Sequence, residues 1–308
     1  MEMLDLRRLA VLAELERLGT LTAVARAMDY SPSAISQQLA LLEREAGTPL
    51  MERVGRGVRL TDPARILAAG AREAADVLER AQSEVARTTG RVEGTLRVAS
   101  FQTVTLALLP AVLVALGQEQ PALRVELAQR EPAEAVDGVL AGTFDVVLGE
   151  EYPGGIIPLR PRMDRAPLGT DELRLAVPEV GPWSGATTIE DLHDAPWAVE
   201  PEQTEPGRWA YALCRTAGFE PRVLFEGEDL TTHAHLVRSG LAVALLPDLL
   251  GAGRMPGIRS VRLPGAPERT LFTLTRAARA MHPAVLAFRS ALATAFAQQQ
   301  VIATSSTT

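Results

Sequence analysis

The segment Ser31–Glu45 reads SPSAISQQLALLERE and predicts one helix with two unlike faces. Ile35, Leu39 and Leu42 recur at the spacing of a single helical face, which favours contact with a hydrophobic core. Another face is small, polar and uncharged, although a solvated helix face usually carries long charged side chains. Its members are Ser33, Ser36, Gln37 and Ala40. Solvation alone does not account for such a face.

The residues before this segment predict a shorter helix, LTAVARAM, and a tight turn. Asp29 tolerates a left-handed backbone, and Ser31 can cap the following helix with Pro32 at its first position. Ala25 would let the two helices approach closely, and Ile35 would fill the gap between them. This spacing is typical of a helix-turn-helix, although a buried helix pair in a larger core would share it.

The next stretch, LMERVGRGVRLT, predicts two short strands around Gly55-Arg56-Gly57, because glycine allows the positive φ of a tight hairpin. Arginines there can reach DNA phosphates or a narrow minor groove, while the helix offers Ser and Gln to base edges. The local basic patch consists of Arg53, Arg56, Arg59 and Arg65. An arginine-tipped hairpin after a candidate recognition helix indicates a wing, although many charge clusters are only solvated surface.

Thr61 is predicted to cap a long helix from about Asp62 to Thr89, with Pro63 tolerated in its first turn. Apolar residues in this helix follow a 4-3-4-3-4 spacing, which is the seam of a coiled coil. They are Leu67, Ala71, Ala74, Leu78, Ala81 and Val85. We expect a homodimer through this helix, because two-fold DNA sites require a two-fold protein. Packing on its own domain is the alternative.

From Gly94 onward, predicted strands and helices alternate, which favours a largely parallel sheet. The strands are TLRVAS, RVELAQ, FDVVLG, ELRLAVP, WAVEP, RVLFEG, VALLP and TLFTLT; the helices cover 104–117, 133–141, 208–217, 230–238 and 283–298, with a short one near IEDL. Two α/β lobes joined by crossing segments predict a cleft at the carboxyl ends of the strands. Lobe I is expected at about 91–163 and 267–300, and lobe II at about 164–266.

Composition and charge are those of a globular protein: 308 residues, 47% hydrophobic and 22% charged, with one cysteine, Cys214. The net charge is −7, but residues 1–66 hold nine arginines and nine acids, so the excess acid lies elsewhere. Charged residues interrupt the opening MEMLDLRRLAVLAELE, unlike a secretory signal, and LALLPAVLVALG is too short for a membrane span. We expect a cytoplasmic protein without a membrane segment.

Residues 6–61 resemble the winged helix-turn-helix of LysR-type transcriptional regulators. The resemblance rests on Leu6, Leu9 and Leu12, then GTLTAVARAM, SPSAISQQLALLE and GTPLMERVGRGVRLT. It implies contacts with double-stranded DNA from Pro32, Ser33, Ser36 and Gln37 on the recognition helix and from Arg53 on the wing, to which the hairpin charges add Arg56 and Arg59. Ala40 departs from the pattern, since many relatives carry Arg or Lys there; Ala46 replaces a common Leu. Without a cation at position 40, the wing is expected to carry more of the salt-dependent affinity.

The resemblance extends over nearly the whole chain. It implies an α/β protein with an N-terminal winged helix-turn-helix (1–61), a linker helix (62–90) and a two-lobed effector domain similar to periplasmic binding proteins (91–308). By this analogy a small-molecule effector contacts Ser100, Phe101, Gln102, Thr103, Gln129, Glu200, Glu202, Thr204, Glu226 and Asp229. Acids near this cleft hint at an amine-bearing ligand, although exposed loop acids are common.

The residues do not support an enzyme, because GxSxG, P-loop and HExxH motifs are absent from the sequence. His233 and His235 are two residues apart and point to different sides of a helix, which disfavours a shared metal. A solute-binding protein would suit the second half but not the added first domain. We therefore expect a dimeric or tetrameric DNA-binding regulator that responds to an effector and needs no metal or other cofactor.

Overall fold

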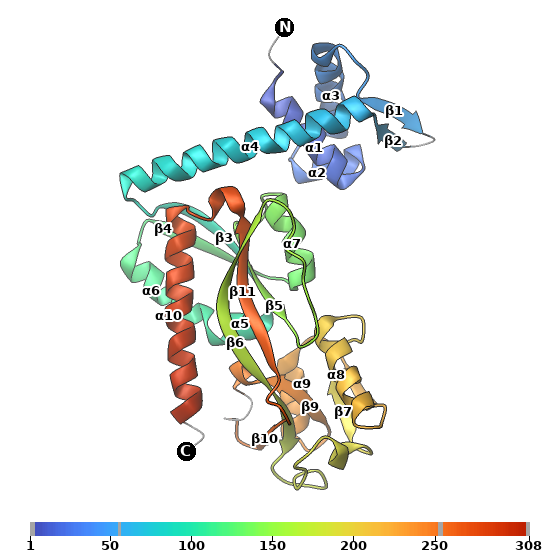
Figure 1. Cartoon of the computed structure of the whole chain (residues 1–308), viewed down its shortest axis with the longest axis vertical. Helices are drawn as coiled ribbons and strands as arrows, with labels where there is room; N and C mark the ends of the chain where they lie inside the picture. The colour runs from blue at the N-terminus through green and yellow to red at the C-terminus, as the bar shows by residue number, and fades with distance from the viewer. Residues whose placement is uncertain (1–3, 55–56, 252–254, 306–308) are drawn as a thin grey trace. The chain divides into compact units, whose positions relative to one another are not determined.

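The structure is a computed structural model that describes residues 4–54, 57–251 and 255–305 (Figure 1). It divides into two compact units, Met1–Val85 and Ala86–Thr308, and each is described by itself. The first unit contains α1 (Leu6–Leu18), α2 (Leu21–Ala27), α3 (Pro32–Ala46), β1 (Met51–Val54), β2 (Gly57–Leu60) and most of α4 (Asp62–Thr89).

Local capping explains where the first helices begin and end. The hydroxyl of Thr20 accepts a hydrogen bond from the Ala23 N–H, and that of Ser31 accepts one from the Ala34 N–H at 3.1 Å. Asp29 takes the left-handed conformation with φ 58°, as the turn prediction required. The helix-turn-helix is thus formed by α2 and α3, whose buried Ala25 and Ile35 join one hydrophobic core.

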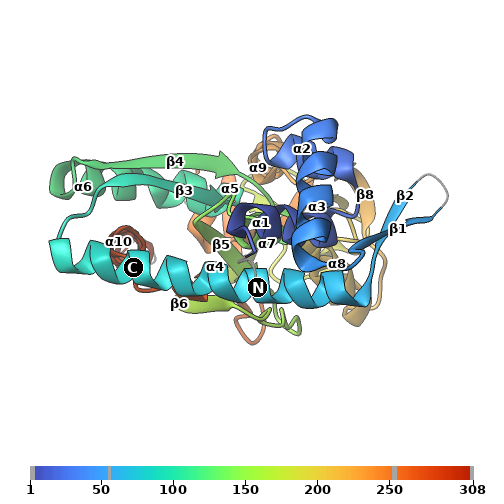
Figure 2. The ribbon, with the colours of Figure 1, turned by 90° about the horizontal axis from the view of Figure 1, so that it is seen from above.

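The hairpin β1–β2 projects from this helical unit beside the beginning of α4 (Figure 2). Its strands are antiparallel, with Met51 opposite Leu60 and Val54 opposite Gly57. Gly57 is not among the residues with positive φ, so the expected left-handed glycine is not found at that position. Gly55 and Arg56 lie outside the described residues.

The long helix α4 has the predicted bounds, and Thr61 accepts a hydrogen bond from the Ala64 N–H. Its predicted seam is divided between two environments. Leu67 packs against the helical core and Ala71 is buried in it, whereas Leu78 and Val85 are 51% and 64% exposed. Leu67 and Ala71, in the earlier part of the seam, therefore belong to the hydrophobic core of the first unit.

The second unit is an α/β domain. Its helices are α5 (Gln102–Ala107), α6 (Leu109–Glu119), α7 (Pro132–Leu140), α8 (Glu205–Thr216), α9 (Leu230–Arg238) and α10 (Pro283–Ser305), with short 3₁₀ turns. Its strands are β3 (Gly94–Ser100), β4 (Leu123–Gln129), β5 (Val146–Glu151), β6 (Met163–Pro178), β7 (Pro196–Val199), β8 (Arg222–Glu226), β9 (Val243–Pro247), β10 (Ile258–Arg262) and β11 (Glu268–Arg276).

The sheet is mixed, so the expectation of a largely parallel sheet was wrong. The strand order is β4-β3-β5-β11-β6-β9-β7-β8, with β10 beside β6. Strands β3, β4 and β5 run parallel, as do β7, β8 and β9, but β6 and β11 are antiparallel to their neighbours. The reason is topological: the chain passes from one part of the sheet to the other along β6 and returns along β11 (Figure 1).

Separate hydrophobic cores lie on the two parts of this sheet. In the first part, Phe288 and Leu292 of α10 pack with α6 and β3, as the sequence predicted for the C-terminal helix. In the second part, Trp197 of β7 packs with α8, and Val237 of α9 packs with β9. Gly169 of β6 lies beside α10; a Cβ there would be 2.3 Å from Phe296, so this close packing requires glycine.

Two elements differ from their predicted extents. The helix predicted over 104–117 is divided at Leu108, just before Pro110, into α5 and α6. Pro110 lacks an N–H to donate to the carbonyl four residues earlier, so the helix is interrupted there and restarts with the proline in the first turn of α6. Strand β6 begins at Met163, well before the predicted ELRLAVP, because β11 pairs with it along that length. Strand β10 was not predicted.

Candidate functional site

The second face of α3 is exposed along its length. Ile35, Leu39 and Leu42 are completely buried, as expected for the core face. The solvent-exposed positions of the helix are Pro32, Ser33, Ser36, Gln37, Ala40 and Arg44. The predicted polar residues are therefore brought together on one accessible surface, which we name the α3 face.

Two neighbouring glutamines of α3 have opposite surroundings. Gln37 is exposed on the α3 face, whereas the Gln38 side-chain oxygen accepts a hydrogen bond from Arg8 Nε of α1 at 3.2 Å. The Ser33 hydroxyl lies 2.9 Å from that of Ser31, the N-cap residue. Gln37 thus keeps its donor and acceptor groups available, which are the groups that read an adenine edge.

Sequence reasoning missed Arg44, the one basic member of the α3 face. It follows Ala40 by one helical turn, and its side chain forms no ion pair with the residues that the structure describes. An arginine at this place supplies a cation that position 40 lacks. The helical spacing 33, 36, 37, 40, 44 could have identified it.

The wing contains an ion pair that lowers its effective positive charge. Arg59 Nη2 of β2 lies 2.8 Å from the carboxylate of Glu52 on β1, directly opposite in the hairpin register. Both side chains are exposed, so salt screens this pair strongly. Arg56 lies outside the described residues, and only the backbone of Arg53, in β1, is described.

In the second unit, one predicted effector residue, Thr103, belongs to a buried polar cluster around Arg269, and Phe101 lies beside it. This arginine of β11 donates to Asp171 of β6 at 2.9 and 2.7 Å and to Glu150 of β5 at 2.5 Å. Its Nη2 also donates to the Thr103 hydroxyl at 2.8 Å, and its guanidinium lies 5.5 Å from the Phe101 ring. Burial raises the pKa of Glu150 and of Asp171, although Arg269 opposes the rise.

Ser100, Phe101 and Thr103 are almost completely buried, and they follow or end β3 as predicted. Their position is set by β3 and by Arg269, which the sequence did not distinguish from the other arginines. We name Arg269, Glu150, Asp171 and Thr103 the Arg269 cluster. It joins strands β5, β6 and β11 to helix α5.

Gln102 and Asp229 contact each other across the domain. The Gln102 side-chain nitrogen donates to Asp229 at 2.6 Å, and its oxygen accepts the Leu230 N–H at 2.9 Å. Hydrogen bonds from Thr231, Gln102 and Thr232 lower the pKa of Asp229 far below its ordinary value. A residue at the start of α5 therefore completes the N-terminus of α9, and it links the two parts of the sheet.

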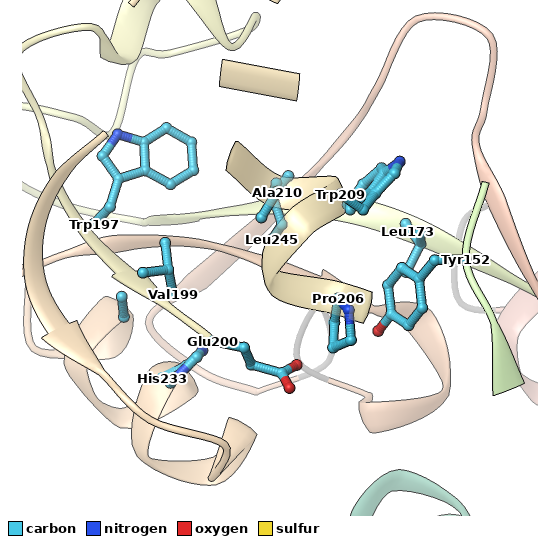
Figure 3. Close-up of a pocket in the computed structure, with 11 residues that line it drawn as sticks. Tyr152, Leu173, Trp197, Val199, Glu200, Pro206, Trp209, Ala210, His233 and Leu245 are labelled. Carbon is cyan, nitrogen blue, oxygen red and sulfur yellow. The ribbon is translucent and has the colours of Figure 1, made fainter. Parts of the chain in front are cut away.

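Glu200 lies just after β7 in a small pocket with Tyr152, Pro206 and His233 (Figure 3). Its carboxylate points toward the side where Pro206 and Tyr152 lie, away from Trp197. Burial, and then the charges of Glu150 and Glu131, raise the pKa of Glu200 to about 9. His233 is buried and contacts the Gly227 carbonyl at 2.8 Å, which fits a packing role.

The remaining predicted effector residues are more dispersed. Gln129 is exposed at the end of β4, opposite Ser100 in the register, and Glu226 is exposed at the end of β8. Glu202 pairs with Arg215 at 2.7 Å. Thr204 caps α8 by accepting the Gly207 N–H at 3.1 Å, and a Cβ on Gly207 would be 2.0 Å from the Pro201 carbonyl.

A larger cavity, of about 500 Å³, lies between α7 and the beginning of α8, which we name the α7–α8 cavity. This volume is within the range of ligand pockets. Of the predicted effector residues only Thr204 lines it. Its apolar wall includes Val136, Ile157, Met163, Phe272 and Leu274. Sequence reasoning missed this wall because its residues come from α7, from the segment that leads into the start of β6, and from β11.

The described residues contain no group of three or more side chains suited to hold a metal ion. Among the helices in the described ranges, none has both the length and the apolar character needed to cross a membrane.

These features define a class of protein. A helix-turn-helix with a projecting hairpin and an accessible polar face is built to contact DNA. An α/β domain with a cavity of ligand size is built to bind a small molecule. The combination is that of a DNA-binding regulator with a separate effector domain.

Comparison with known families gives the particular assignment. Residues 6–65 match the bacterial regulatory helix-turn-helix of the LysR family, and residues 89–297 match the LysR substrate binding domain. The chain belongs to the LysR family of transcriptional regulators. It is a DNA-binding transcriptional regulator with an effector-binding domain, and both the resemblance and the fold class inferred from the sequence are confirmed.

Relatives of this chain carry the same function in their names. It is 29% identical to the regulator ClcR of Pseudomonas putida over 85% of this chain and 89% of that protein. It is 27% identical to the dual regulator GltC of Bacillus subtilis, covering 85% and 86%. These relatives are transcriptional regulators, which confirms the expectation that the chain is not an enzyme.

Solved structures show the same architecture. The crystal structure of CbnR, a LysR family regulator, is 27% identical and covers 94% of this chain and 99% of that one, with a TM-score of 0.53. CbnR has also been solved with its target DNA. A full-length OxyR variant from Pseudomonas aeruginosa, 21% identical and covering 95% of both chains, has the same fold with a TM-score of 0.66.

Proposed function

We propose that the α3 face reads base edges in the major groove of double-stranded DNA. The observation that carries this proposal is the exposed set Ser33, Ser36 and Gln37 on a helix whose opposite face is completely buried. Short hydroxyl and amide groups suit base edges, and Pro32 at the helix start brings this end close to the DNA backbone. We assign residues 1–61 to the DNA-binding domain, 62–90 to the linker helix and 91–308 to the effector domain.

Basic residues at the edge of this face supply the electrostatic part of binding. Arg44 extends the α3 face, while Arg53, Arg56 and Arg59 belong to the wing. Contacts of arginine with phosphate position the protein without reading sequence. Since Arg59 is paired with Glu52, we assign the larger share of this attraction to Arg44, Arg53 and Arg56.

A small-molecule effector binds between the two parts of the α/β domain and changes their closure. The Gln102 hydrogen bonds to Asp229 and Leu230 join these parts, so a ligand that alters them changes the equilibrium between arrangements. The candidate contacts inferred from the sequence are retained: Ser100, Phe101, Gln102, Thr103, Gln129, Glu200, Glu202, Thr204, Glu226 and Asp229. The regulator acts where DNA is, in the cytoplasm.

The active species is a homodimer through α4 that can pair into a tetramer. The exposure of the apolar residues Leu78 and Val85, seven positions apart in the later part of α4, supports this proposal. Alanine between them lets two helix backbones approach closely. A two-fold protein matches a two-fold DNA site.

Titration of the full-length protein against its own upstream DNA, in a gel-shift assay at several salt concentrations, tests the DNA-binding proposal. We expect binding that prefers this sequence over a scrambled one and weakens steeply with salt. Equal affinity for both sequences at every salt concentration would contradict the assignment of the α3 face.

A further inference from the structure

The base of the wing is bonded to the end of the recognition helix. Glu43 lies in the last turn of α3, and its Oε1 accepts the Leu50 N–H at 2.8 Å and the Met51 N–H at 3.0 Å. These two amides stand at the point where the chain enters β1. One carboxylate oxygen of α3 therefore anchors the first strand of the wing.

The residue that follows β2 ties the other side of the wing to α4. The Thr61 N–H donates to the Leu50 carbonyl at 3.1 Å, and the Thr61 hydroxyl donates to the Pro49 carbonyl at 2.9 Å. The same hydroxyl accepts the Ala64 N–H at the start of α4. Leu50 itself is completely buried in the core of the helical unit. The base of the hairpin is thus bonded on both sides, by Glu43 from α3 and by Thr61 from α4.

The place of Glu43 is unfavourable for a carboxylate that has no local use. The C-terminal end of a helix carries a partial negative charge, which disfavours an acid in the last turn. The N–H groups of Leu50 and Met51 offset this cost, because charge-assisted hydrogen bonds are stronger than neutral ones. Partly buried amides also need an acceptor, which a truncated side chain at position 43 would not supply.

Glu43 also lies on the side of α3 that carries base-reading residues. It follows Ser36 by seven positions, or two helical turns, so both side chains leave the helix in similar directions. Gln37 lies six positions before Glu43, which is about 9 Å along the helix axis at a rise of about 1.5 Å per residue. One rigid helix therefore carries both the α3 face and the anchor of the wing.

We propose that Glu43 is a positioning residue for DNA binding, whose carboxylate sets the wing where its arginines reach phosphates while the α3 face occupies the major groove. This inference rests on the proposed DNA contacts and adds a residue that acts through the wing. Such preorganisation raises affinity because the wing is ordered before DNA binds. Phosphate contacts do not read sequence, so the loss of the anchor weakens binding to all DNA.

Three substitutions at position 43 separate positioning from simple charge. Loss of a negative charge beside DNA would by itself raise affinity, whereas loss of the anchor lowers it. Glu43→Ala removes both the charge and the anchor. Glu43→Asp keeps the charge, but its side chain is one methylene shorter and does not reach both amides. Glu43→Gln removes the charge and keeps an oxygen that accepts the two N–H groups.

A gel-shift titration of the full-length variants with the upstream DNA measures these effects. We expect Glu43→Ala and Glu43→Asp to bind about fivefold to tenfold more weakly than the wild type, with a flatter dependence on salt. Glu43→Gln should bind at least as tightly as the wild type. Wild-type or higher affinity in both the alanine and the aspartate variants would overturn the proposal.

A second background shows whether Glu43 acts through the wing. The protein with Arg53→Ala and Arg56→Ala lacks two wing charges of the proposed function, and we name it the wing-neutral background. There Glu43→Ala should weaken binding by less than about twofold, because those charges are no longer present to be positioned. A loss as large as in the wild-type background would overturn the proposal.

Glu45→Ala is the matched control. Glu45 lies in the same turn of α3, but it pairs with Arg8 and accepts the Asp5 N–H at 3.4 Å, so it ties α3 to the start of α1. Its removal deletes the same charge, and its effect on affinity should be equal in the two backgrounds. An effect that disappears in the wing-neutral background, as predicted for Glu43→Ala, would overturn the particular role of Glu43.

Hydrogen exchange without DNA separates this proposal from the proposed function. Exchange of the peptide over residues 48–52, followed by mass spectrometry, should be about fivefold faster in Glu43→Ala than in the wild type and unchanged in Glu45→Ala. Unchanged exchange in Glu43→Ala would overturn the anchor. Wild-type protein that binds DNA without sequence preference contradicts the assignment of the α3 face, and the exchange result still decides whether Glu43 holds the wing. Sequence-preferring wild-type binding with full affinity in Glu43→Ala and Glu43→Asp contradicts only the positioning role.

Discussion

The α3 face and the Arg269 cluster are both polar, yet their side chains are used in opposite ways. On α3, Ser33, Ser36 and Gln37 are exposed and have few partners within the chain. In the cluster, Arg269 is 1% exposed and holds two carboxylates and a hydroxyl from three other elements. The first set is available to another molecule, whereas the second holds its own domain together.

This difference shows that a polar residue near a predicted site indicates function only when its hydrogen-bond and ion-pair partners are known. An unpaired buried charge is costly, so the groups of the Arg269 cluster are committed to one another. The polar groups on the surface of α3 bear no such cost. Their positions are fixed only by the packing of the buried face of the helix. The function of the α3 face therefore depends on its contacts with another molecule.

The largest expected effect, on stability, comes from replacing Arg269 at the centre of the Arg269 cluster. Arg269→Met leaves Glu150 and Asp171 buried without a counterion, so the free energy of unfolding should fall by about 3–5 kcal/mol. Urea unfolding followed by tryptophan fluorescence measures this, because Trp183, Trp197 and Trp209 all lie in the second unit.

Arg262→Met is the matched control for this prediction. Arg262 is also paired, with Glu172 at 2.9 Å, but its side chain is 68% exposed. Its loss should lower the free energy of unfolding far less than the loss of Arg269, because solvent screens an exposed ion pair. Similar losses in the two variants would contradict the view that the Arg269 cluster holds the domain together.

A smaller effect, on binding rather than stability, is expected from Gln37→Ala. The variant should lose about 1–3 kcal/mol of discrimination between the native upstream site and a scrambled sequence, since one base-edge contact is removed. Fluorescence anisotropy with both DNAs measures it. Gln38→Ala provides the control, because that amide contacts Arg8; if it reduced discrimination as much as Gln37→Ala, the exposed face would not be the reading surface.

The pH dependence of stability tests how a buried polar group of the second unit, Glu200, behaves. Its pKa is raised to about 9, chiefly by burial and then by Glu150 and Glu131, while in the unfolded chain it ionises near 4.5. Between these values the folded state holds a proton that the unfolded state has released, so stability falls as pH rises. Glutamine does not titrate.

Glu200→Gln should therefore stabilise the second unit by about 1–2 kcal/mol at pH 8, with little effect near pH 5. In thermal unfolding this is a rise of roughly 2–8 °C at pH 8. A difference between variant and wild type that stays constant from pH 5 to pH 8 would show that Glu200 titrates normally in the folded protein.

The smallest effect is expected at the wing. Glu52→Gln releases Arg59 from its partner and removes a negative charge near DNA, so affinity for any DNA sequence should rise by about twofold at low salt. Filter binding at 50 and 200 mM salt would measure the gain and its loss through screening. A fall in affinity would indicate that the ion pair itself holds the hairpin in its binding shape.

Local signals were sufficient for the first unit. Ser31 and Thr61 cap α3 and α4, and Asp29 supplies the turn, so these features could be predicted from short stretches of sequence. Alternation of apolar residues separated the buried and exposed faces of α3. Arg44 was overlooked although its spacing was equally visible.

In the second unit, the sequence could not reveal contacts between residues that are far apart along the chain. Arg269 contacts Asp171 and Glu150, which are 98 and 119 residues away, and nothing in its own neighbourhood distinguishes it from a surface arginine. The start of β6 at Met163 depends on β11, and the wall of the α7–α8 cavity comes from three separated segments. Whether the predicted effector residues contact a ligand stays a prediction.

The passage of the chain along β6 and its return along β11 has a consequence for synthesis on the ribosome. β11 lies between β5 and β6, and α10 supplies Phe288 to the core over β3, yet both follow the whole second part of the sheet in the sequence. The first part cannot complete its sheet or its core while the intervening segment is being translated. A nascent chain arrested before β11 should therefore expose β5 as an unpaired edge and depend on chaperones.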